Sequence, residues 1–387
     1  MKILVTVNTF YPKIDGVQTV TEYLVMGLIA KGHSVTVVTT NAEGSPEEEL
    51  YNGIRILRTN VYTKYALYHG NKKKYQNMIK ELANEHDIMI NICTQNALTD
   101  YLLPILNEID CKKILHLHGM HNFVWEKNDF LDIKHFMYKL WRNIRWGMLY
   151  KINKNKFKHY NAVLQLHRFD SANVYFKKKY NISSIILENA CNAEFSIETR
   201  KNIIKEKICI CVANYTERKN QEFVLRAFYN TKITDDWKLV FIGGNMNSYY
   251  NKLVELNKQL IRTNGKRNVE FLTGLSRAYT IELVKKSSIY LMGSTWEAFS
   301  ISIIEAMASA TPFISTDTGV TRYLPGGVVI ENEEDMTYWI EIFANNKEIR
   351  NHYGNAGSEY YLKNLTINCK VNELNKVIND VVEKNEY

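Results

Sequence analysis

The sequence has few cysteines and no long hydrophobic run. The six cysteines are Cys93, Cys111, Cys191, Cys209, Cys211 and Cys369. They form no C-x-x-C pair and no paired zinc spacing, which argues against a zinc knuckle and leaves a disulfide framework without support. No apolar run reaches the roughly 18 residues that a membrane span requires. The first residues, MKILVTVNTF, alternate as in a strand and lack a small-residue cleavage site. We therefore expect a protein of the reducing cytoplasm, with any membrane contact peripheral.

Several motifs of nucleotide and hydrolase chemistry are missing as well. After the first predicted strand the chain reads VNTFYPKIDGVQ, which is not the G-x-G-x-x-G of dinucleotide enzymes, so hydride transfer loses its main support. The Gly-Lys pair at 265–266 lacks the rest of a Walker loop, which excludes a phosphate-loop NTPase. G-x-S-x-G and H-E-x-x-H are also absent. So is the D-x-D with which metal-dependent sugar transferases commonly hold their cation, and its absence favours a metal-free reaction.

Short apolar runs alternate with longer amphipathic stretches along the chain. In the first half the runs lie at 2–7, 34–40, 87–92, 112–118, 162–167 and 183–188. The amphipathic stretches between them lie at 17–31, 72–84, 97–107 and 134–152. The second half continues with runs at 207–214, 237–244, 269–273, 288–293 and 312–317. Such an alternation predicts parallel sheets covered by helices on both faces, with Cys209 and Cys211 buried in a strand.

The length of 387 residues suggests two to three domains at roughly 150 residues each. Hydrophobic residues at 45% and charged residues at 23% are typical of a folded globular protein. We predict an α/β protein of two doubly wound, Rossmann-like domains facing a central cleft. The first spans 1–192 and the second 193–369, and a helix within 370–387 crosses back to the first domain. Open sheets of this kind bind ligands at the carboxyl ends of their strands.

The net charge of +8 comes from one basic segment, residues 134–158. It contains eight basic residues and no acidic one, and outside it the two signs balance at 41 each. A single basic surface does not fit a nucleic-acid coat, so no nucleic-acid partner is expected. One helical stripe of this segment carries its apolar side chains, which are Met137, Leu140, Trp141, Ile144 and Met148.

Two interpretations of this segment remain open. The stripe packs against its own sheet while the charges meet water, or the segment lies on an anionic membrane. In the second case Trp141, Trp146 and Tyr150 would sit at the level of the lipid headgroups, and each basic residue would add about 1 kcal/mol of attraction. We expect the stripe to face the core and the charges to face a membrane, since both can hold together.

The stretch from 287 to 320 has the features most typical of a ligand site. A predicted strand ends near Met292, a polar turn follows, and a helix is predicted over 299–309, closed by Pro312. The first amides of this helix would point out of its positive end, which suits a diphosphate. They are the amides of Phe299, Ser300 and Ile301.

Two carboxylates flank this predicted anion site. Glu297 lies in the turn and Glu305 lies inside the helix. Since carboxylates repel phosphate, their partners are expected to be hydroxyl groups, those of a ribose for Glu305 and those of a sugar for Glu297. The alternative is that Glu297 only complements the helix dipole and that Glu305 is a solvated helix residue.

This region resembles a known family. The two glutamates, within EAFSISIIEAMASATPF, are similar to the E-x7-E signature of the family-four retaining glycosyltransferases, which have the GT-B fold. That family usually has glycines where this chain has Ala298 and Ser300, so any requirement for a positive φ there would be strained. Residues 11–40 resemble the opening of the family, in which a glycine loop precedes a helix. Gly16 stands in that loop, and Asp15 replaces the usual first glycine.

Two further segments resemble the same family. His118-Gly119 matches its H-G, whose histidine lies near the reacting sugar. Residues 212–223 match its strand and basic loop, where an Arg and a Lys bind the donor phosphates. Lys219 matches the lysine, whereas Asn214 stands at the usual arginine position, and Arg218 is expected to supply the missing charge.

The resemblance implies a metal-independent, retaining hexosyltransferase that uses a nucleotide-diphosphate sugar and no cofactor. The implied catalytic residues are His118, Lys219 and Glu297. The implied donor-binding residues are Gly16, Arg218, Lys219, Glu297, Phe299, Ser300, Ile301 and Glu305.

The acceptor is expected to be a saccharide or lipid-linked saccharide. The basic face suggests a lipid-linked or anionic saccharide in cell-surface polysaccharide synthesis, at the inner face of the membrane. The basic segment 134–158 would make the membrane contact. Two alternatives remain, a GT-B sugar-nucleotide epimerase and a non-catalytic subunit that binds a nucleotide sugar.

Overall fold

The computed structural model describes residues 1–125, 127–130, 132–199 and 203–383. Its contacts divide the chain into two compact units, a first unit of Met1–Glu188 with Lys370–Tyr387 and a second unit of Asn189–Cys369. The sequence places the join within 189–205, and residues 200–202 of that segment lie outside the described residues. The same holds for 384–387 at the end of the predicted C-terminal helix.

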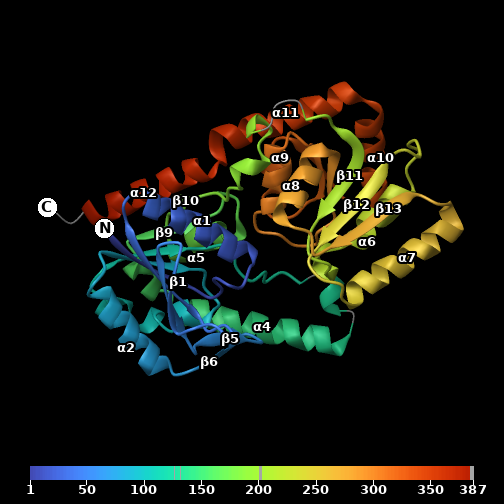
Figure 1. Cartoon of the computed structure of the whole chain (residues 1–387). Helices are drawn as coiled ribbons and strands as arrows, with labels where there is room; N and C mark the ends of the chain where they lie inside the picture. The colour runs from blue at the N-terminus through green and yellow to red at the C-terminus, as the bar shows by residue number, and fades with distance from the viewer. Residues whose placement is uncertain (126, 131, 200–202, 384–387) are drawn as a thin grey trace. The chain divides into compact units, whose positions relative to one another are not determined.

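The first unit contains an eight-stranded sheet in the order β10-β9-β8-β7-β1-β2-β4-β3 (Figure 1). Its strands are β1 (Lys2–Val7), β2 (Ser34–Thr40), β3 (Glu48–Tyr51), β4 (Ile54–Thr59), β7 (Ile88–Ile92), β8 (Lys112–His116), β9 (Ala162–Gln165) and β10 (Ile185–Ile186). All neighbours pair in parallel except β3 and β4. The predicted parallel sheet is therefore confirmed but for an antiparallel edge. Asn52 and Gly53, with φ of 51° and 81°, join β3 to β4 in a tight hairpin.

Helices lie on both faces of this sheet (Figure 1). They are α1 (Gly16–Ala30), α2 (Lys72–Ala83), α3 (Ala97–Asp100), α4 (Ile133–Ile152), α5 (Ser171–Tyr180) and α12 (Ile367–Glu383). A small hairpin of β5 (Tyr62–Lys64) and β6 (Leu67–His69) is attached beside the sheet. From Lys370 onward, α12 packs closely on α1, because a Cβ added at Gly27 would lie only 2.2 Å from Cγ2 of Val371.

The second unit contains a parallel six-stranded sheet in the order β13-β12-β11-β14-β15-β16. Its strands are β11 (Glu206–Val212), β12 (Lys238–Gly243), β13 (Asn268–Thr273), β14 (Ser287–Met292), β15 (Phe313–Thr316) and β16 (Gly327–Ile330). Its helices are α6 (Gln221–Tyr229), α7 (Ser248–Asn264), α8 (Arg277–Lys286), α9 (Ile301–Ala308), α10 (Glu333–Asn345) and α11 (Lys347–Asn364). Two Rossmann-like units are thereby confirmed, and Cys209 and Cys211 are buried as predicted.

The orientation of α4 differs from the prediction. Its buried residues are Lys139, Trp146, Leu149 and Tyr150. Three of the five residues of the predicted core stripe are exposed instead, with exposed fractions of 53% for Met137, 54% for Ile144 and 54% for Met148, while Leu140 and Trp141 are half-buried. The core interpretation of the stripe is therefore wrong, and so is the placement of Trp146 and Tyr150 at lipid headgroups.

Aromatic burial explains this orientation of α4. Trp146 and Tyr150 belong to the first unit's core, and the Tyr150 hydroxyl hydrogen-bonds to that of Thr94 at 2.7 Å. These rings bury more apolar surface than the methionines of the stripe. Lys139 goes inward with them, where its ammonium donates to the Asn122 carbonyl at 2.9 Å and lies 3.5 Å from Asp129.

In the part of the chain that the structure describes, no helix is long and apolar enough to cross a bilayer.

Candidate active site

The loop between β14 and α9 leads into a helix tip without a side-chain cap. β14 ends at Met292, and α9 begins at Ile301 after an extended Ser300. The hydroxyls of Ser300 and Ser302 pair at 3.0 Å, and Ser300 makes no capping bond to the backbone. Since the first amides of a helix have no acceptor inside it, those of Ile301, Ser302 and Ile303 point out of the positive end.

The helix start predicted at Phe299 is wrong by two residues. Phe299 lies before the helix, with its ring buried and its carbonyl accepting a hydrogen bond from Asn189 Nδ2 at 3.0 Å. In the sequence Phe299 simply fits the helical period. Its hydrogen bond to Asn189 cannot be read from the sequence, because Asn189 lies in a distant segment. The amides available to an anion are therefore those of 301–303, in place of 299–301.

The substitutions in the family motif are accommodated without backbone strain. Neither Ala298 nor Ser300 has a positive φ, so the expected strain does not arise. The required glycine lies elsewhere, at Gly319, with φ of 57°. A Cβ there would lie 2.3 Å from the Ala298 carbonyl oxygen and 2.5 Å from that of Glu297. Gly319 therefore lets a second segment pass close behind this loop, a role that the sequence analysis missed.

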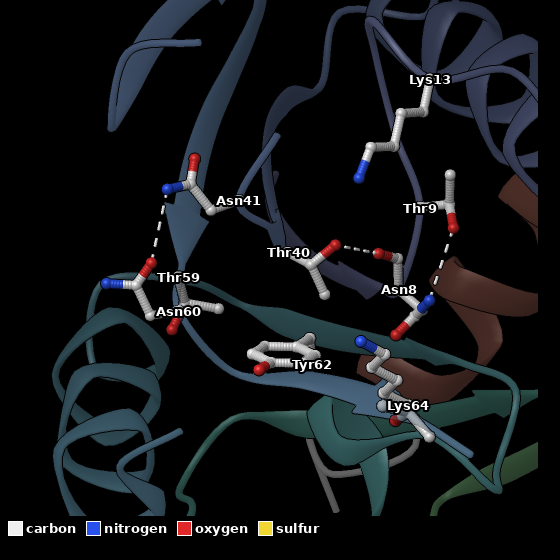
Figure 2. A pocket seen from close by; sticks show the side chains of 10 residues that line it. Asn8, Thr9, Lys13, Thr40, Asn41, Thr59, Asn60, Tyr62 and Lys64 are labelled. Carbon is white, nitrogen blue, oxygen red and sulfur yellow. Dashed lines mark hydrogen bonds between the residues drawn. The ribbon is translucent and has the colours of Figure 1, made fainter. Parts of the chain in front are cut away.

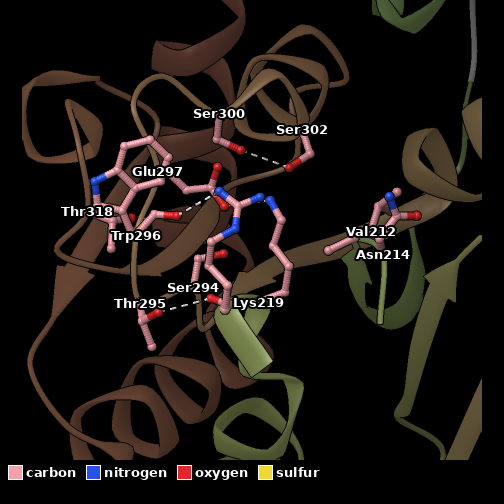
Figure 3. A network of polar contacts seen from close by, with 12 residues as sticks. Val212, Asn214, Lys219, Ser294, Thr295, Trp296, Glu297, Ser300, Ser302 and Thr318 are labelled. Carbon is pink, nitrogen blue, oxygen red and sulfur yellow. Dashed lines mark hydrogen bonds and ion pairs between the residues drawn. The ribbon is translucent and has the colours of Figure 1, made fainter. Parts of the chain in front are cut away.

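Lys219 and Glu297 meet in front of this helix tip. Lys219 ends the short 3₁₀ helix Glu217–Lys219 that follows β11. Its Nζ lies 2.5 Å from Oε1 of Glu297, and the two side chains are 17% and 11% exposed. Figure 3 shows this ion pair with Ser300 and Ser302 beside it. The loop and the 3₁₀ helix are also joined by the backbone, because the Thr295 amide donates to the Arg218 carbonyl at 2.8 Å.

Arg218 lies beside the loop that contains Glu297, whereas Asn214 lies away from it. The Arg218 guanidinium donates to the Trp296 carbonyl at 3.4 Å and lies 5.6 Å from the centre of its ring. It therefore borders the loop that contains Glu297. Asn214 lies apart from the Lys219–Glu297 pair (Figure 3). The guanidinium at this loop therefore comes from Arg218. It does not come from position 214, where the family usually has its arginine.

Glu305 is buried in α9 and forms an ion pair with Arg277 at the start of α8. Its side chain is 4% exposed, whereas that of Arg277 is 53% exposed. Burial raises the pKa of the Glu305 carboxyl, and the Arg277 charge opposes that rise. The interpretation of Glu305 as a solvated helix residue is therefore wrong. The Arg277 guanidinium also lies 4.7 Å from the Phe195 ring, a contact that nothing in the sequence signals.

Gly16 and His118 lie in the first unit. Gly16 is the first residue of α1, whose amide at Gln18 donates to the Asp15 carboxylate at 2.8 Å. Asp15 thus caps the helix where the family usually has a glycine. His118 follows β8, and its ring lies 4.2 Å from that of His116. Its Nε2 is buried and has no hydrogen-bond partner among the described residues, and burial lowers its pKa to about 4.

The predicted residues thus form two groups. The first unit holds Gly16 and His118, and the second unit brings Arg218, Lys219 and Glu297 to the α9 tip, with Glu305 inside that helix. In the described ranges, no cluster of three or more His, Cys, Asp or Glu side chains could hold a metal ion.

Two family models match the chain. Residues 194–360 match glycosyl transferases group 1, and residues 14–165 match glycosyltransferase family 4. Two curated relatives are uncharacterized glycosyltransferases of Methanocaldococcus jannaschii. One is 31% identical over 145 residues, which is 36% of this chain and only 34% of the relative. The other is 24% identical over 336 residues, which is 82% of this chain and 81% of the relative.

The chain is also similar in fold to solved structures. The chain is similar to a sucrose-phosphate synthase from Thermosynechococcus elongatus, with a TM-score of 0.73, 14% identity and 99% of each chain covered. It is also similar to HepE of Anabaena, solved in complex with UDP and glucose. In that match the TM-score is 0.68 and the identity 11%, with 98% of this chain and 100% of that chain covered. At these identities the likeness shows the GT-B fold alone.

Proposed function

Because the chain belongs to the family-four glycosyltransferases of the GT-B fold, we propose that it moves a hexosyl group from a nucleotide-diphosphate sugar to a saccharide or lipid-linked saccharide. The main observation behind this proposal is that Lys219 and Glu297 lie at the N-terminus of α9, which has no side-chain cap. A cation and a set of free amides suit a diphosphate, and a carboxylate beside them suits sugar hydroxyls.

The proposed catalysis acts on the leaving group. As the bond from the anomeric carbon to the phosphate oxygen breaks, negative charge grows on the nucleoside diphosphate. The Lys219 ammonium and the amides of 301–303 stabilise that charge, with Arg218 at the edge of the loop. Lys219 is already held in place by Glu297, at 2.5 Å, before any ligand binds. Little reorganisation is therefore needed when the donor arrives.

The carboxylates and the histidine have positioning roles in this proposal. Glu305 accepts hydrogen bonds from the ribose hydroxyls, and Glu297 accepts one from the transferred sugar. His118 hydrogen-bonds the donor sugar or positions the acceptor. Since burial lowers its pKa to about 4, the ring is neutral at pH 7 and acts there as a hydrogen-bonding group without charge.

We further propose that transfer retains the anomeric configuration and requires no metal. Attack from the face that the diphosphate leaves, with a phosphate oxygen taking the acceptor proton, needs no separate general base. The missing D-x-D supports metal independence. Lys219 would then supply the positive charge that a cation supplies in other transferases.

The first prediction concerns turnover. Incubated with UDP-, GDP- and ADP-hexoses and a panel of glycans, the protein is expected to release nucleoside diphosphate and form a glycoside with the anomeric configuration of the donor. The reaction should continue in EDTA. Proton NMR of the anomeric signal and a coupled assay for the diphosphate measure both. An inverted product would refute retention of configuration. Loss of activity in EDTA, with recovery on adding a divalent cation, would refute metal independence. A second free sugar nucleotide formed without acceptor would indicate an epimerase.

We also propose that α4 places the enzyme on an anionic membrane surface, where a lipid-linked acceptor for cell-surface polysaccharide would reside. The exposed stripe of α4 consists of Ile133, Met137, Ile144, Met148 and Ile152, with Trp141 half-buried among them. Lys134 and Lys151 flank this stripe and are exposed. An amphipathic helix with such a face lies in the plane of a membrane interface.

The second prediction tests this surface. The full chain is expected to co-sediment with vesicles of phosphatidylcholine and phosphatidylglycerol but weakly with phosphatidylcholine alone. Ile144→Asp should reduce binding about tenfold or more, because it places a charge in the apolar stripe. Val174→Asp, at a residue of α5 that is 50% exposed, is the matched control and should bind as the parent does. Equal binding of all three proteins to anionic vesicles would contradict the proposal.

A further inference from the structure

A polar pocket lies at the carboxyl ends of β1, β2 and β4 in the first unit (Figure 2). Its volume is about 420 Å³, within the range of about 300–1,000 Å³ that small-molecule sites occupy. The residues that line it are Asn8, Thr9, Lys13, Thr40, Asn41, Thr59, Asn60, Tyr62, Thr63 and Lys64. The pocket thus combines amides and hydroxyls with two cations and one aromatic ring.

The two charged side chains that line this pocket are both lysines. Lys13 and Lys64 extend their ammonium groups into it (Figure 2). No acidic side chain lines the pocket, and neither lysine forms an ion pair within the described part of the chain. The Lys64 ammonium lies 5.6 Å from the centre of the Tyr65 ring. Two lysines that converge without a counter-charge favour an anionic ligand.

The polar lining suits a sugar. The buried amide oxygen of Asn8 has no hydrogen-bond partner among the described residues, as expected of a group that a ligand hydroxyl satisfies. One face of the Tyr62 ring stacks on His69, with ring centres 4.8 Å apart, and the ring is 44% exposed. The ring lines the pocket (Figure 2), and an aromatic face suits the C–H face of a pyranose.

The position of the pocket connects it with His118. In the sheet, β7 separates β1 from β8, and Asn8 and His118 follow the carboxyl ends of those two strands. Since neighbouring strands lie about 4.8 Å apart, the pocket begins roughly 10 Å from the histidine. A sugar held in the pocket can therefore extend a second residue or a hydroxyl toward His118.

We propose that this pocket binds the acceptor and that the acceptor carries an anionic group, a phosphate or a carboxylate, on the sugar that enters it. The inference rests on the proposed function, because it takes the nucleotide donor to be held by the second unit. Lys13 and Lys64 pair with the anion, Tyr62 stacks on the ring, and Asn8 with Thr40 and Asn41 binds its hydroxyls.

Binding measurements on the full chain test the proposal. The probes are glucose 6-phosphate, glucuronate, glucose and inorganic phosphate, titrated by calorimetry. The two anionic sugars are expected to bind at least tenfold more tightly than glucose and than inorganic phosphate. Lys13→Gln and Lys64→Gln should each raise the dissociation constant for the anionic sugars about tenfold and leave that for glucose nearly unchanged. Both lysines are exposed, so these variants should fold.

Lys31→Gln is the matched control, since Lys31 is exposed in the same unit and does not line the pocket. It should bind all probes as the parent does. Glucose binding as tightly as its phosphate, or both pocket variants binding like the parent, would overturn the proposal. Inorganic phosphate binding as tightly as glucose 6-phosphate would overturn its sugar part. Stabilisation by UDP, GDP or ADP, measured on the same samples, reports the donor site separately, so failure of the pocket and failure of the proposed function are distinguishable.

Discussion

Replacing Lys219 with alanine is expected to remove the stabilisation of the protein by nucleoside diphosphate. The variant loses the cation that faces the diphosphate, and it leaves the Glu297 carboxylate, which is 11% exposed, unpaired beside the same anion. Truncating one member of such a charge pair costs about 2–5 kcal/mol, which corresponds to at least a thirtyfold loss of affinity. A ligand at about 100 times its dissociation constant adds about 2.7 kcal/mol, and a hundredfold weaker affinity reduces this to about 0.4 kcal/mol.

Thermal shifts with UDP, GDP and ADP measure this effect. Lys266→Ala is the control, because Lys266 is exposed in the same unit and forms no ion pair within the described residues. It should keep the full ligand-induced shift. The double variant Lys219→Ala/Glu297→Gln should regain part of the affinity for bare diphosphate, since the repulsive carboxylate is gone. A Lys219→Ala variant with the parent's shift would contradict the donor assignment.

Replacing Glu305 with alanine is expected to abolish the same ligand-induced shift by another route. Glu305 is the proposed acceptor for two ribose hydroxyls, and hydrogen bonds to a charged group contribute about 1.5–3 kcal/mol each. The unliganded variant should melt somewhat lower but still fold, because Arg277 is 53% exposed and its charge remains hydrated after its partner is removed.

Two further variants separate binding from folding. Glu305→Gln keeps the size of the side chain but offers one accepting oxygen in place of two, so a large part of the loss should persist. Glu359→Ala, at an exposed position of α11, should leave both the melting temperature and the ligand shift unchanged. If Glu305→Ala melted lower yet kept the parent's ligand-induced shift, Glu305 would be a structural residue only.

The fold could be predicted because its signals are local. Buried strands such as β1 and β14 stand out as short apolar runs, and the helices between them follow from amphipathic periodicity. The antiparallel edge also had a local signal, since Asn52-Gly53 is the typical sequence of a tight hairpin turn. The flanking strands do not stand out as apolar runs because charged residues interrupt them, Glu48 and Glu49 in β3 and Arg55 and Arg58 in β4. β16 was missed because it begins in a glycine pair and is only four residues long.

The contacts of the site could not be predicted from the sequence, because they join distant segments. Lys219 and Glu297 are 78 positions apart, so the sequence suggests each residue but not their ion pair. The pairing of Arg277 with Glu305 and the passage of Gly319 behind the loop depend in the same way on the packing of neighbouring elements. The prediction of which face of α4 is buried was wrong, because the helix carries two apolar stripes. Periodicity identifies both, and the stripe with the aromatic residues is the one that packs against the core.

The most direct test of the central claim is a crystal structure of the full chain with the nucleoside diphosphate that stabilises it most. We expect phosphate oxygens within about 3.2 Å of Lys219 Nζ and of at least one amide nitrogen among residues 301–303. Diphosphate bound at another place, with Lys219 still paired only to Glu297, would contradict the claim.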